Sequence, residues 1–406
     1  MTTKNNIPTG YKDSAVGIIP QEWEVKRLGT IAKCFSGGTP KSESEEMYGG
    51  TIPFIRSGEI HSNKTALFLT DDGLRKSSAK MVDVGDLIFA LYGANSGDCA
   101  ISQINGAINQ AILCIRSSSL INPFLQPYLE LQKDKFIAKY LQGGQGNLSG
   151  EIVSSYTIPV PPMEEQRKIA EILGVWDEAI EKQSRLIEKL ELRKRGLMQR
   201  LLTGRTRLPG FTTPWQKVKL GEIGRFISGC VFNENEQGGK VGFPFFKVSD
   251  MNLCGNEVRM TKSNNYVTQE QIERLNYIVV KDEAIIFAKV GAAIALERKR
   301  YAKDFIIDNN MLAYVPNTNI WYMKYWFDSI KLSKYIQVGA LPSYNASDLA
   351  IIKLNLPSLP EQKAIAEVLT TADDEIATHR KKLDALRLQK RGLMQQLLTG
   401  KTRVKI

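Results

Sequence analysis

The sequence predicts an α+β protein in which two similar globular domains are each followed by a long helix. The two helices are expected to form an antiparallel coiled coil with pseudo-twofold symmetry. The residues 161–208 recur without a gap at 357–404, 196 positions later. Each copy carries a long helical pattern of apolar residues, and each follows a stretch of short apolar runs broken by glycines. The chain is therefore two copies of one design.

The best-matched part of the repeat is Lys-Arg-Gly-Leu-Met-Gln, followed one residue later by Leu-Leu-Thr-Gly. It occupies residues 194–204 in the first copy and 390–400 in the second. Unrelated segments agree only at scattered positions, so an ungapped run of this kind indicates a duplicated unit. The globular parts match mainly where they begin, at Trp23 and Leu28 against Trp215 and Leu220.

Residues spaced three and four apart in each copy mark the seam of a coiled coil. In the first copy they are Leu173, Trp176, Ile180, Gln183, Ile187, Leu190 and Leu197. In the second they are Leu369, Ile376, His379, Leu383, Leu386 and Leu393. Each helix should span about 40 residues and about 60 Å. The polar members Gln183 and His379 either fix the register of the pair or point partly to solvent.

The charges predict how the helices pair. Each helix is acidic in its first half and basic in its second half. An antiparallel pair sets each acidic half against a basic half and opposes the helix dipoles, whereas a parallel pair places like charges together. The connection from Leu202 to Trp215 also reaches only roughly 40 Å, which is too short to run back along the coil.

The expected domain boundaries are 1–20 for an N-terminal lead-in, 21–160 for the first globular domain, 161–204 for the first long helix, 205–356 for the second globular domain and 357–406 for the second long helix. Within the first globular domain, four apolar runs are predicted strands, at 52–55, 86–92, 99–101 and 111–115. A helix is predicted at 123–141.

The net charge of +11 favours a polyanionic partner, either nucleic acid or an anionic membrane surface. No apolar run approaches the length of about 18 residues that a membrane-spanning helix needs. The first ten residues are polar and lack a signal-peptide core. We therefore expect a soluble, cytoplasmic protein with no membrane partner.

The chemistry-bearing motifs of enzymes are missing. Five cysteines without a Cys-x-x-Cys pair, and only two histidines, do not predict a metal site. Gly400 to Thr402 match only the tail of a phosphate-binding loop, because Gln395 stands where the first glycine is required. There is no Asp/Asn-Pro-Pro-aromatic tetrapeptide typical of amino-methyltransferases. The chain is predicted to hold no catalytic residue and no cofactor.

Two globular domains, each followed by a long helix ending in Lys-Arg-Gly-Leu-Met-Gln-x-Leu-Leu-Thr-Gly, resemble the specificity subunit of type I restriction-modification systems. Glu-Gln at 165–166 and 361–362, and Ser-Gly-Gly-Thr-Pro at 36–40 with Ile-Pro-Phe-Ile at 52–55, also carry this resemblance, which covers essentially the whole chain. It implies that each globular domain is a target-recognition domain reading one half of a split DNA sequence. The helices would then set the spacing and dock two methyltransferase subunits.

The resemblance also implies where the chemistry lies. The methyltransferase partners would carry S-adenosylmethionine, and separate motor-nuclease subunits would carry ATP hydrolysis and cleavage with magnesium. This chain would be a non-catalytic subunit that binds double-stranded DNA.

Base edges are read by polar and basic side chains, whereas lysine and arginine also bind the DNA backbone. In the first domain the predicted DNA contacts are Thr39, Lys41, Arg56, Ser57, Tyr92, Asn95, Gln145 and Asn147. In the second domain they are Lys247, Ser249, Lys289, Ser343, Tyr344 and Asn345. Because the loops of the two domains differ, we expect an asymmetric target with two different half-sites.

Three alternatives remain open. The first is the specificity subunit of a related system in which methylation and cleavage share one partner chain. The second is a DNA methyltransferase that acts alone, and the third is a coiled-coil scaffold whose basic charge serves only solubility. Methylation by the purified chain would indicate the second, and the third predicts no sequence-selective DNA binding.

Overall fold

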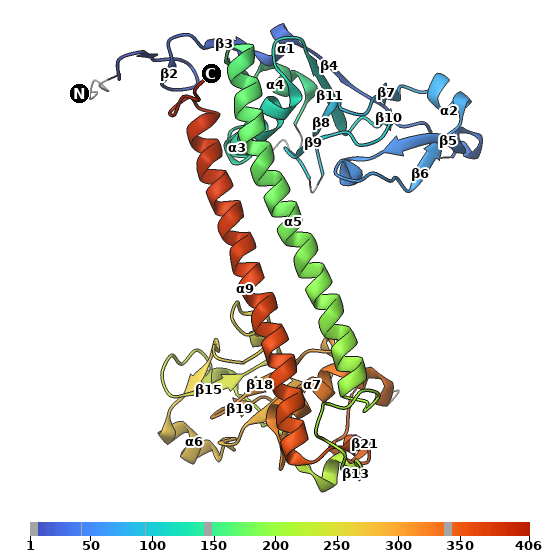
Figure 1. Cartoon of the computed structure of the whole chain (residues 1–406), viewed down its shortest axis with the longest axis vertical. Helices are drawn as coiled ribbons and strands as arrows, with labels where there is room; N and C mark the ends of the chain where they lie inside the picture. The colour runs from blue at the N-terminus through green and yellow to red at the C-terminus, as the bar shows by residue number, and fades with distance from the viewer. Residues whose placement is uncertain (1–6, 42, 94, 142–147, 337–342) are drawn as a thin grey trace. The chain divides into compact units, whose positions relative to one another are not determined.

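A computed structural model describes residues 7–41, 43–93, 95–141, 148–336 and 343–406 (Figure 1). The chain divides into two compact units, one made of residues 1–184 with 381–406 and the other of residues 185–380. Two long helices, α5 (Met163–Leu201) and α9 (Leu359–Leu397), contribute residues to both units. The predicted α+β fold with two long helices is confirmed.

The first unit contains two four-stranded sheets. One is antiparallel, in the order β4 (Ala32–Ser36), β11 (Ile112–Ser117), β8 (Leu87–Ala90) and β9 (Cys99–Ile101). The other has the order β6 (Leu67–Leu69), β5 (Tyr48–Ile55), β10 (Gly106–Ile108) and β7 (Lys80–Val82), with β5 and β10 parallel. All four predicted strands are present.

Short elements complete the first unit. The hairpin of β1 (Tyr11–Lys12) and β2 (Ile19–Pro20) precedes β3 (Glu24–Arg27), which pairs with β12 (Thr157–Val160). The helices are α1 (Leu28–Ile31), α2 (Asp71–Arg75), α3 (Asn122–Leu141) and α4 (Gly150–Ser155), and the short 3₁₀ turns are η1 (Glu45–Met47) and η2 (Ser57–Glu59). Helix α3 covers the predicted helix at 123–141.

The second unit repeats this plan. Its antiparallel sheet has the order β14 (Gly224–Ser228), β20 (Met311–Pro316), β17 (Ala284–Ala288) and β18 (Lys299–Ala302). The second sheet has the order β16 (Tyr266–Val267), β15 (Phe243–Phe246) and β19 (Ile306–Ile307), with β15 and β19 parallel. A third pair joins β13 (Gln216–Lys219) to β21 (Lys353–Leu356).

The remaining elements of the second unit are also short. The helices are α6 (Gln269–Leu275), α7 (Ile320–Ser329) and α8 (Ala346–Ala350). The 3₁₀ turns are η3 (Leu220–Glu222), η4 (Glu234–Glu236), η5 (Val248–Asn252), η6 (Ala292–Leu296) and η7 (Leu332–Tyr335). Side-chain oxygens start two of the helices, since Thr268 accepts the Gln271 N–H and Asn319 accepts the Tyr322 N–H.

The long helices pair in antiparallel order within each unit. In the first unit, Lys390 of α9 forms an ion pair of 2.5 Å with Asp177 of α5. In the second, Lys194 of α5 forms an ion pair of 2.5 Å with Asp373 of α9. Each acidic partner comes from the first half of one helix and each lysine from the second half of the other. Pairing of the acidic half of each helix with the basic half of the other is what the predicted antiparallel pattern requires.

Each long helix begins at a buried carboxylate held by the globular domain. In the first unit, Trp23 Nε1 donates to Glu165 at 2.8 Å, and Arg403 Nε donates to the same carboxylate at 2.8 Å. In the second unit, Glu361 accepts from Trp215 Nε1 at 3.1 Å and from Arg207 Nε at 2.6 Å. Both glutamate side chains are fully buried. The same glutamate, tryptophan and arginine contact therefore attaches each long helix to its globular domain.

The predicted seam residues are all buried or half-buried. Those that are buried are Leu173, Gln183, Ile187, Leu190, Leu369, Ile376 and Leu383. Those that are half-buried are Trp176, Ile180, Leu197, His379, Leu386 and Leu393. Each long helix is followed by a glycine with positive φ, Gly204 at 70° and Gly400 at 71°, which ends the helix as the sequence pattern predicts.

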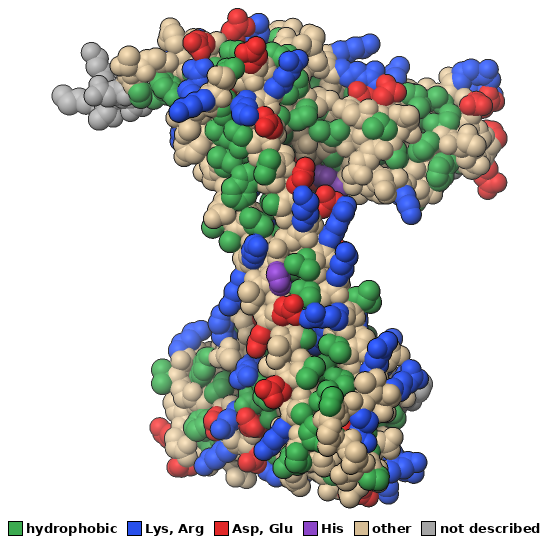
Figure 2. All heavy atoms as spheres, viewed as in Figure 1, with side chains coloured by type: hydrophobic (Ala, Val, Ile, Leu, Met, Phe, Trp, Pro, Cys, Tyr) green, Lys and Arg blue, Asp and Glu red, His purple; other side chains and the backbone are tan. Residues whose placement is uncertain are grey.

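Positively charged side chains are dispersed. On the face in view, Lys and Arg lie over both units and along the long helices, with Asp and Glu among them (Figure 2). Charge alone therefore does not mark a binding site on this face. Within the described ranges, none of the helices has an apolar stretch sufficient to span a bilayer.

Candidate nucleic-acid interface

The candidate site of the first unit is built at one edge of its mixed sheet. Strands β5 and β10 are parallel, with Ile55 opposite Ile108, so their carboxyl ends meet at the same edge. Arg56 follows the first strand and Asn109 follows the second. The Asn109 N–H donates to the Ile55 carbonyl at 3.4 Å, which holds the two ends together. Side chains that leave this edge therefore share one surface.

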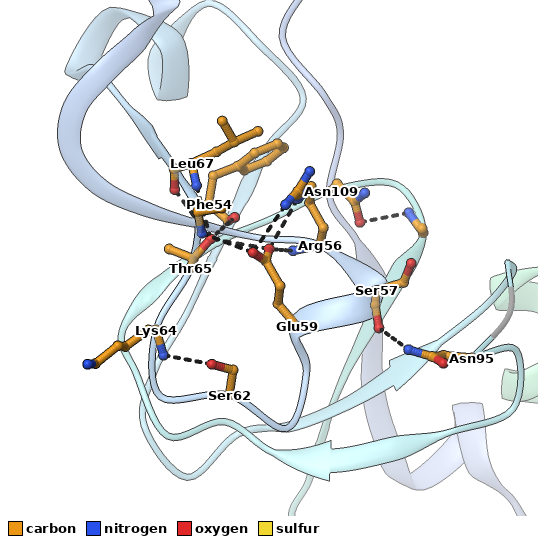
Figure 3. A network of polar contacts seen from close by, with 12 residues as sticks. Phe54, Arg56, Ser57, Glu59, Ser62, Lys64, Thr65, Leu67, Asn95 and Asn109 are labelled. Atoms are coloured by element: carbon orange, nitrogen blue, oxygen red, sulfur yellow. Dashed lines mark hydrogen bonds and ion pairs between the residues drawn. The ribbon is translucent and has the colours of Figure 1, made fainter. Parts of the chain in front are cut away.

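Glu59 organises the loop that follows β5 (Figure 3). Its carboxylate accepts the backbone N–H of Arg56 at 3.2 Å and that of Ala66 at 2.9 Å, as well as the Arg56 Nε–H at 3.1 Å. The Thr65 hydroxyl donates to the Phe54 carbonyl at 2.6 Å and lies 3.2 Å from Glu59. The loop is thus fixed by a carboxylate that binds both of its ends.

This network also sets the local charge. Burial alone would raise the pKa of Glu59, but the hydrogen bonds from Arg56 and Ala66 and the Arg56 charge hold it below its ordinary value. Glu59 is therefore ionised at neutral pH and fixes the guanidinium, whose side chain remains 46% exposed. Arg56 is positioned by its partner and still accessible to a ligand.

The second unit contains the same network with other residues. Lys247 follows β15, and its backbone N–H donates to the buried Asp250 at 2.8 Å. Asp250 also accepts the Asn264 N–H at 3.1 Å, as Glu59 accepts that of Ala66. The Ser263 hydroxyl donates to the Phe245 carbonyl at 2.8 Å, as Thr65 does to Phe54. Both units therefore hold the loop after this strand with a carboxylate and place one basic residue at its start, exposed in Arg56 and half-buried in Lys247.

A sequence signal for this scaffold exists, although the sequence analysis did not use it. The pattern Pro-Phe-x-basic-x-x-acidic occurs at 53–59 and again at 244–250. The separation of these two segments is 191 residues, whereas the long helices repeat after 196. Insertions between the matched segments shift the register, so the correspondence is hard to see in an ungapped comparison.

Most predicted contact residues of the first domain gather at this edge. The Asn95 amide donates to the Ser57 carbonyl at 3.2 Å, which joins the loop at 92–97 to the loop after β5 (Figure 3). Thr39 is exposed and donates to the side-chain oxygen of Gln110, a residue that the sequence analysis did not select. Gln110 also lies near the Tyr92 hydroxyl, where it opposes the rise that burial causes in the pKa of Tyr92. Lys41 is exposed, whereas Gln145 and Asn147 lie outside the described residues.

The predicted contacts of the second domain are less uniform. Ser249 and Asn345 are exposed, and Lys247 is half-buried with Nζ donating to Gln237 at 3.1 Å. The Tyr344 N–H donates to the Lys289 carbonyl at 3.0 Å, which brings two predicted loops together. Ser343 forms an isolated bridge with Val290.

One of these predictions needs correction. The ring of Tyr344 is only 4% exposed and packs edge-on against Phe287, with ring centroids 6.3 Å apart. The sequence predicts Tyr344 as a DNA contact because it stands in a loop of small and polar residues. In the folded unit it fills the core, because the adjacent strand β17 is buried along its whole length. Tyr344 therefore holds the loop and does not face a ligand.

Two α+β domains share the same carboxylate-held loop and expose different side chains from it. This arrangement is typical of a protein with two separate recognition domains. The comparisons with known proteins agree. The family model of the type I restriction modification DNA specificity domain matches residues 20–192 and again residues 212–388. The chain therefore belongs to this family, as a specificity subunit with two target-recognition domains.

Individual relatives are similar over nearly their full length. The type I restriction enzyme MjaVIII specificity subunit of Methanocaldococcus jannaschii is 26% identical, over 95% of this chain and 94% of the relative. The putative MjaX specificity subunit of the same organism is 29% identical, over 97% of each.

Solved structures share the fold. A chain from a type I restriction-modification system has a TM-score of 0.63 at 18% identity, covering 95% of this chain and 99% of that chain. The specificity subunit from M. genitalium has a TM-score of 0.55 at 16% identity and covers 98% of both chains.

Proposed function

We propose that each globular domain reads one half of an asymmetric, bipartite DNA sequence, and that the long helices set the spacing between the half-sites. The single observation that carries this proposal is the repeated scaffold at the strand ends. Glu59 and Asp250 hold equivalent loops by equivalent hydrogen bonds, whereas the side chains that those loops expose differ. Two domains that hold their loops in the same way but expose different side chains can bind two different base sequences.

The long helices are also proposed to dock two methyltransferase subunits. In this arrangement the methyltransferases bind S-adenosylmethionine, and motor-nuclease subunits bind ATP and magnesium and cleave DNA. This chain contributes recognition without catalysis in a cytoplasmic complex. The names of the relatives, which are specificity subunits of type I restriction enzymes, support this division of labour.

The experiment that tests the proposal is selection of bound duplexes from a random DNA pool. The chain is purified with the co-expressed methyltransferase that binds it, and the selected duplexes are sequenced. Two short, different motifs at one fixed separation are the expected result. A single motif would contradict reading by both domains, and no enrichment would favour the scaffold alternative.

Substitution of the two basic residues should affect separate half-sites. Arg56→Ala is expected to relax or weaken one half-motif by about 1–3 kcal/mol, the typical contribution of a good base contact. Lys247→Ala should affect only the other half-motif. The measurement is the selected motif of each variant together with its Kd for a duplex carrying the wild-type target.

A matched control removes the same charge elsewhere in the first unit. Lys26 lies on β3, where its side chain is 43% exposed, and Lys26→Ala should leave both half-motifs unchanged. Equal losses at both half-motifs from Arg56→Ala would count against separate reading heads.

A further inference from the structure

Gln110 occupies a distinctive position in the first unit. It follows Asn109 at the end of β10, where the Asn109 side-chain oxygen accepts the Ala111 N–H at 3.1 Å. This local turn places Gln110 at its tip, and the side chain is exposed. Two loops from other parts of the domain reach it, since Thr39 donates to its side-chain oxygen and the Tyr92 hydroxyl lies near the same side chain.

These neighbours orient the side-chain amide of Gln110 and leave some of its hydrogen-bonding groups without a partner among them. An amide offers two lone pairs on oxygen and two hydrogens on nitrogen. Thr39 occupies one lone pair. Burial raises the pKa of the Tyr92 hydroxyl, and the nearby Gln110 side chain opposes that rise. With Thr39 on one lone pair, a second lone pair and an amide N–H of Gln110 are open to a ligand.

A free acceptor and a free donor on one planar amide match one base in the major groove. Adenine presents its N6 amino group as a donor and N7 as an acceptor, and Gln or Asn binds both together. A side chain that is already oriented loses less conformational freedom when it binds. The contacts of Gln110 therefore suit it to select adenine.

The second unit has an equivalent residue in a different setting. The Asp308 N–H donates to the Phe246 carbonyl at 3.0 Å, and its side-chain oxygen accepts the Asn310 N–H at 3.2 Å, as Asn109 does in the first unit. Asn309 is thus the counterpart of Gln110, and it is exposed. Within the part of the chain that the structure describes, no hydrogen bond engages its side chain.

The residues that surround this position differ as well. Val231 stands two residues after Gly229, as Thr39 stands two residues after Gly37, and Val290 takes the place of Tyr92 before the matched glycine. A parallel bridge between Cys230 and Asp308 brings the segments of Val231 and Asn309 together. Val231 is 64% exposed, so an apolar surface lies where the first unit has a hydroxyl.

We propose that Gln110 and Asn309 are equivalent specificity-determining residues, each selecting adenine in the half-site that its own domain reads. Thr39 and Tyr92 are positioning residues for Gln110. Val231 contributes an apolar contact to the methyl group of a thymine next to Asn309. The inference rests on the proposed function, because it assigns residues to the reading of the two half-sites.

The test uses the full chain with its methyltransferase partner and the selection from random DNA. Gln110→Ala should lower the preference for adenine at one base pair of one half-motif by roughly 5- to 140-fold. Gln110→Glu should shift that base pair from adenine to cytosine, because a carboxylate accepts from the cytosine amino group. Asn309→Ala should lower the preference for adenine only in the other half-motif.

The positioning residues give a second measurement. Thr39→Val and Tyr92→Phe remove hydrogen-bonding groups with little change of size, and each should reduce discrimination at the Gln110 base pair about threefold to tenfold. Thr39→Ser keeps the hydroxyl, so this variant should discriminate at the Gln110 base pair as the wild type does. A merely structural role would instead weaken every position of that half-motif equally, which would overturn the assignment.

The apolar contact is tested with a modified duplex. Replacing thymine by deoxyuridine in the half-site read by the second domain should weaken binding of the wild-type complex about fourfold at one position. The Val231→Ser complex should bind both duplexes equally. An unchanged deoxyuridine penalty in Val231→Ser would overturn the role of this valine.

The outcomes separate the two levels of proposal. If the wild-type complex selects two half-motifs and the Gln110 and Asn309 variants select the same ones, the residue assignment is wrong and the reading function stands. If the wild-type complex selects no bipartite motif, the proposed function itself fails.

Discussion

Glu361→Ala is expected to lower the free energy of unfolding of the second unit by about 3 kcal/mol. Glu361 is fully buried and accepts hydrogen bonds from Arg207 and Trp215. Removing one partner of a buried ion pair costs about 3–5 kcal/mol, because the other charge is left without compensation. Arg207 is 29% exposed and can partly rehydrate, so we expect the lower end of this range.

The measurement must resolve the two units, because a protein with separate folded units need not unfold in one step. Denaturant unfolding followed by tryptophan fluorescence reports on the five tryptophans of both units together. Hydrogen exchange resolved by peptide therefore assigns the loss to one unit. Exchange should increase around residues 205–220 and along the first turns of α9. Glu165→Ala should produce the equivalent change in the first unit, around Trp23 and Arg403.

Two further variants define the contribution of charge. Glu361→Gln keeps an acceptor for the Trp215 indole but loses the negative charge, so a smaller cost of about 1–2 kcal/mol is expected. Glu367 lies on the same helix and is exposed, so Glu367→Ala should change stability by less than about 0.5 kcal/mol. The anchoring role is wrong if Glu361→Ala and Glu367→Ala have the same effect.

Ile187→Asp should disrupt the pairing of the long helices in the second unit and abolish co-purification with the methyltransferase. Ile187 is 8% exposed, and a carboxylate placed there would be buried without a designed partner. Burial of an unpaired charge costs several kcal/mol. Because the methyltransferase is proposed to bind the paired helices, loss of pairing should remove its binding surface.

The control for this variant, Leu192, lies further along α5. Leu192 is 63% exposed, so Leu192→Asp introduces the same charge without burying it. Circular dichroism and co-purification from cells that express both proteins should be unchanged for Leu192→Asp. Retention of the methyltransferase by Ile187→Asp would argue that docking does not depend on the helix seam.

Local pattern was sufficient for the framework of the fold. The three-and-four spacing of apolar residues and the separation of acidic from basic halves are visible within each helix segment. The ungapped repeat is visible when segments 196 residues apart are compared. The pairing of Lys194 with Asp373 follows from that charge separation. These features depend on helix periodicity and on charge, which a sequence states directly.

The candidate site was predictable only in part. The polar, glycine-rich loops around Arg56 and Asn95 indicated a binding surface, and the structure brings these loops together. Gln110 was missed, because a single glutamine after a strand carries no pattern of its own. The prediction of Tyr344 as a DNA contact was wrong, because its position in a loop does not reveal that its ring fills the core.

The amino-acid sequence by itself determined that this protein is a tandem of two α+β domains on two antiparallel helices, since the periodicity of each helix and the separation of charge along it are set by residues close in sequence. Only the tertiary structure decided which side chains stand together at each candidate site. Thr39, Tyr92 and Gln110 come from three loops, and they meet because β4 and β8 both pair with β11, the strand that begins just after Gln110. Contacts across such separations depend on which strands pair, and that pairing joins segments far apart in the sequence.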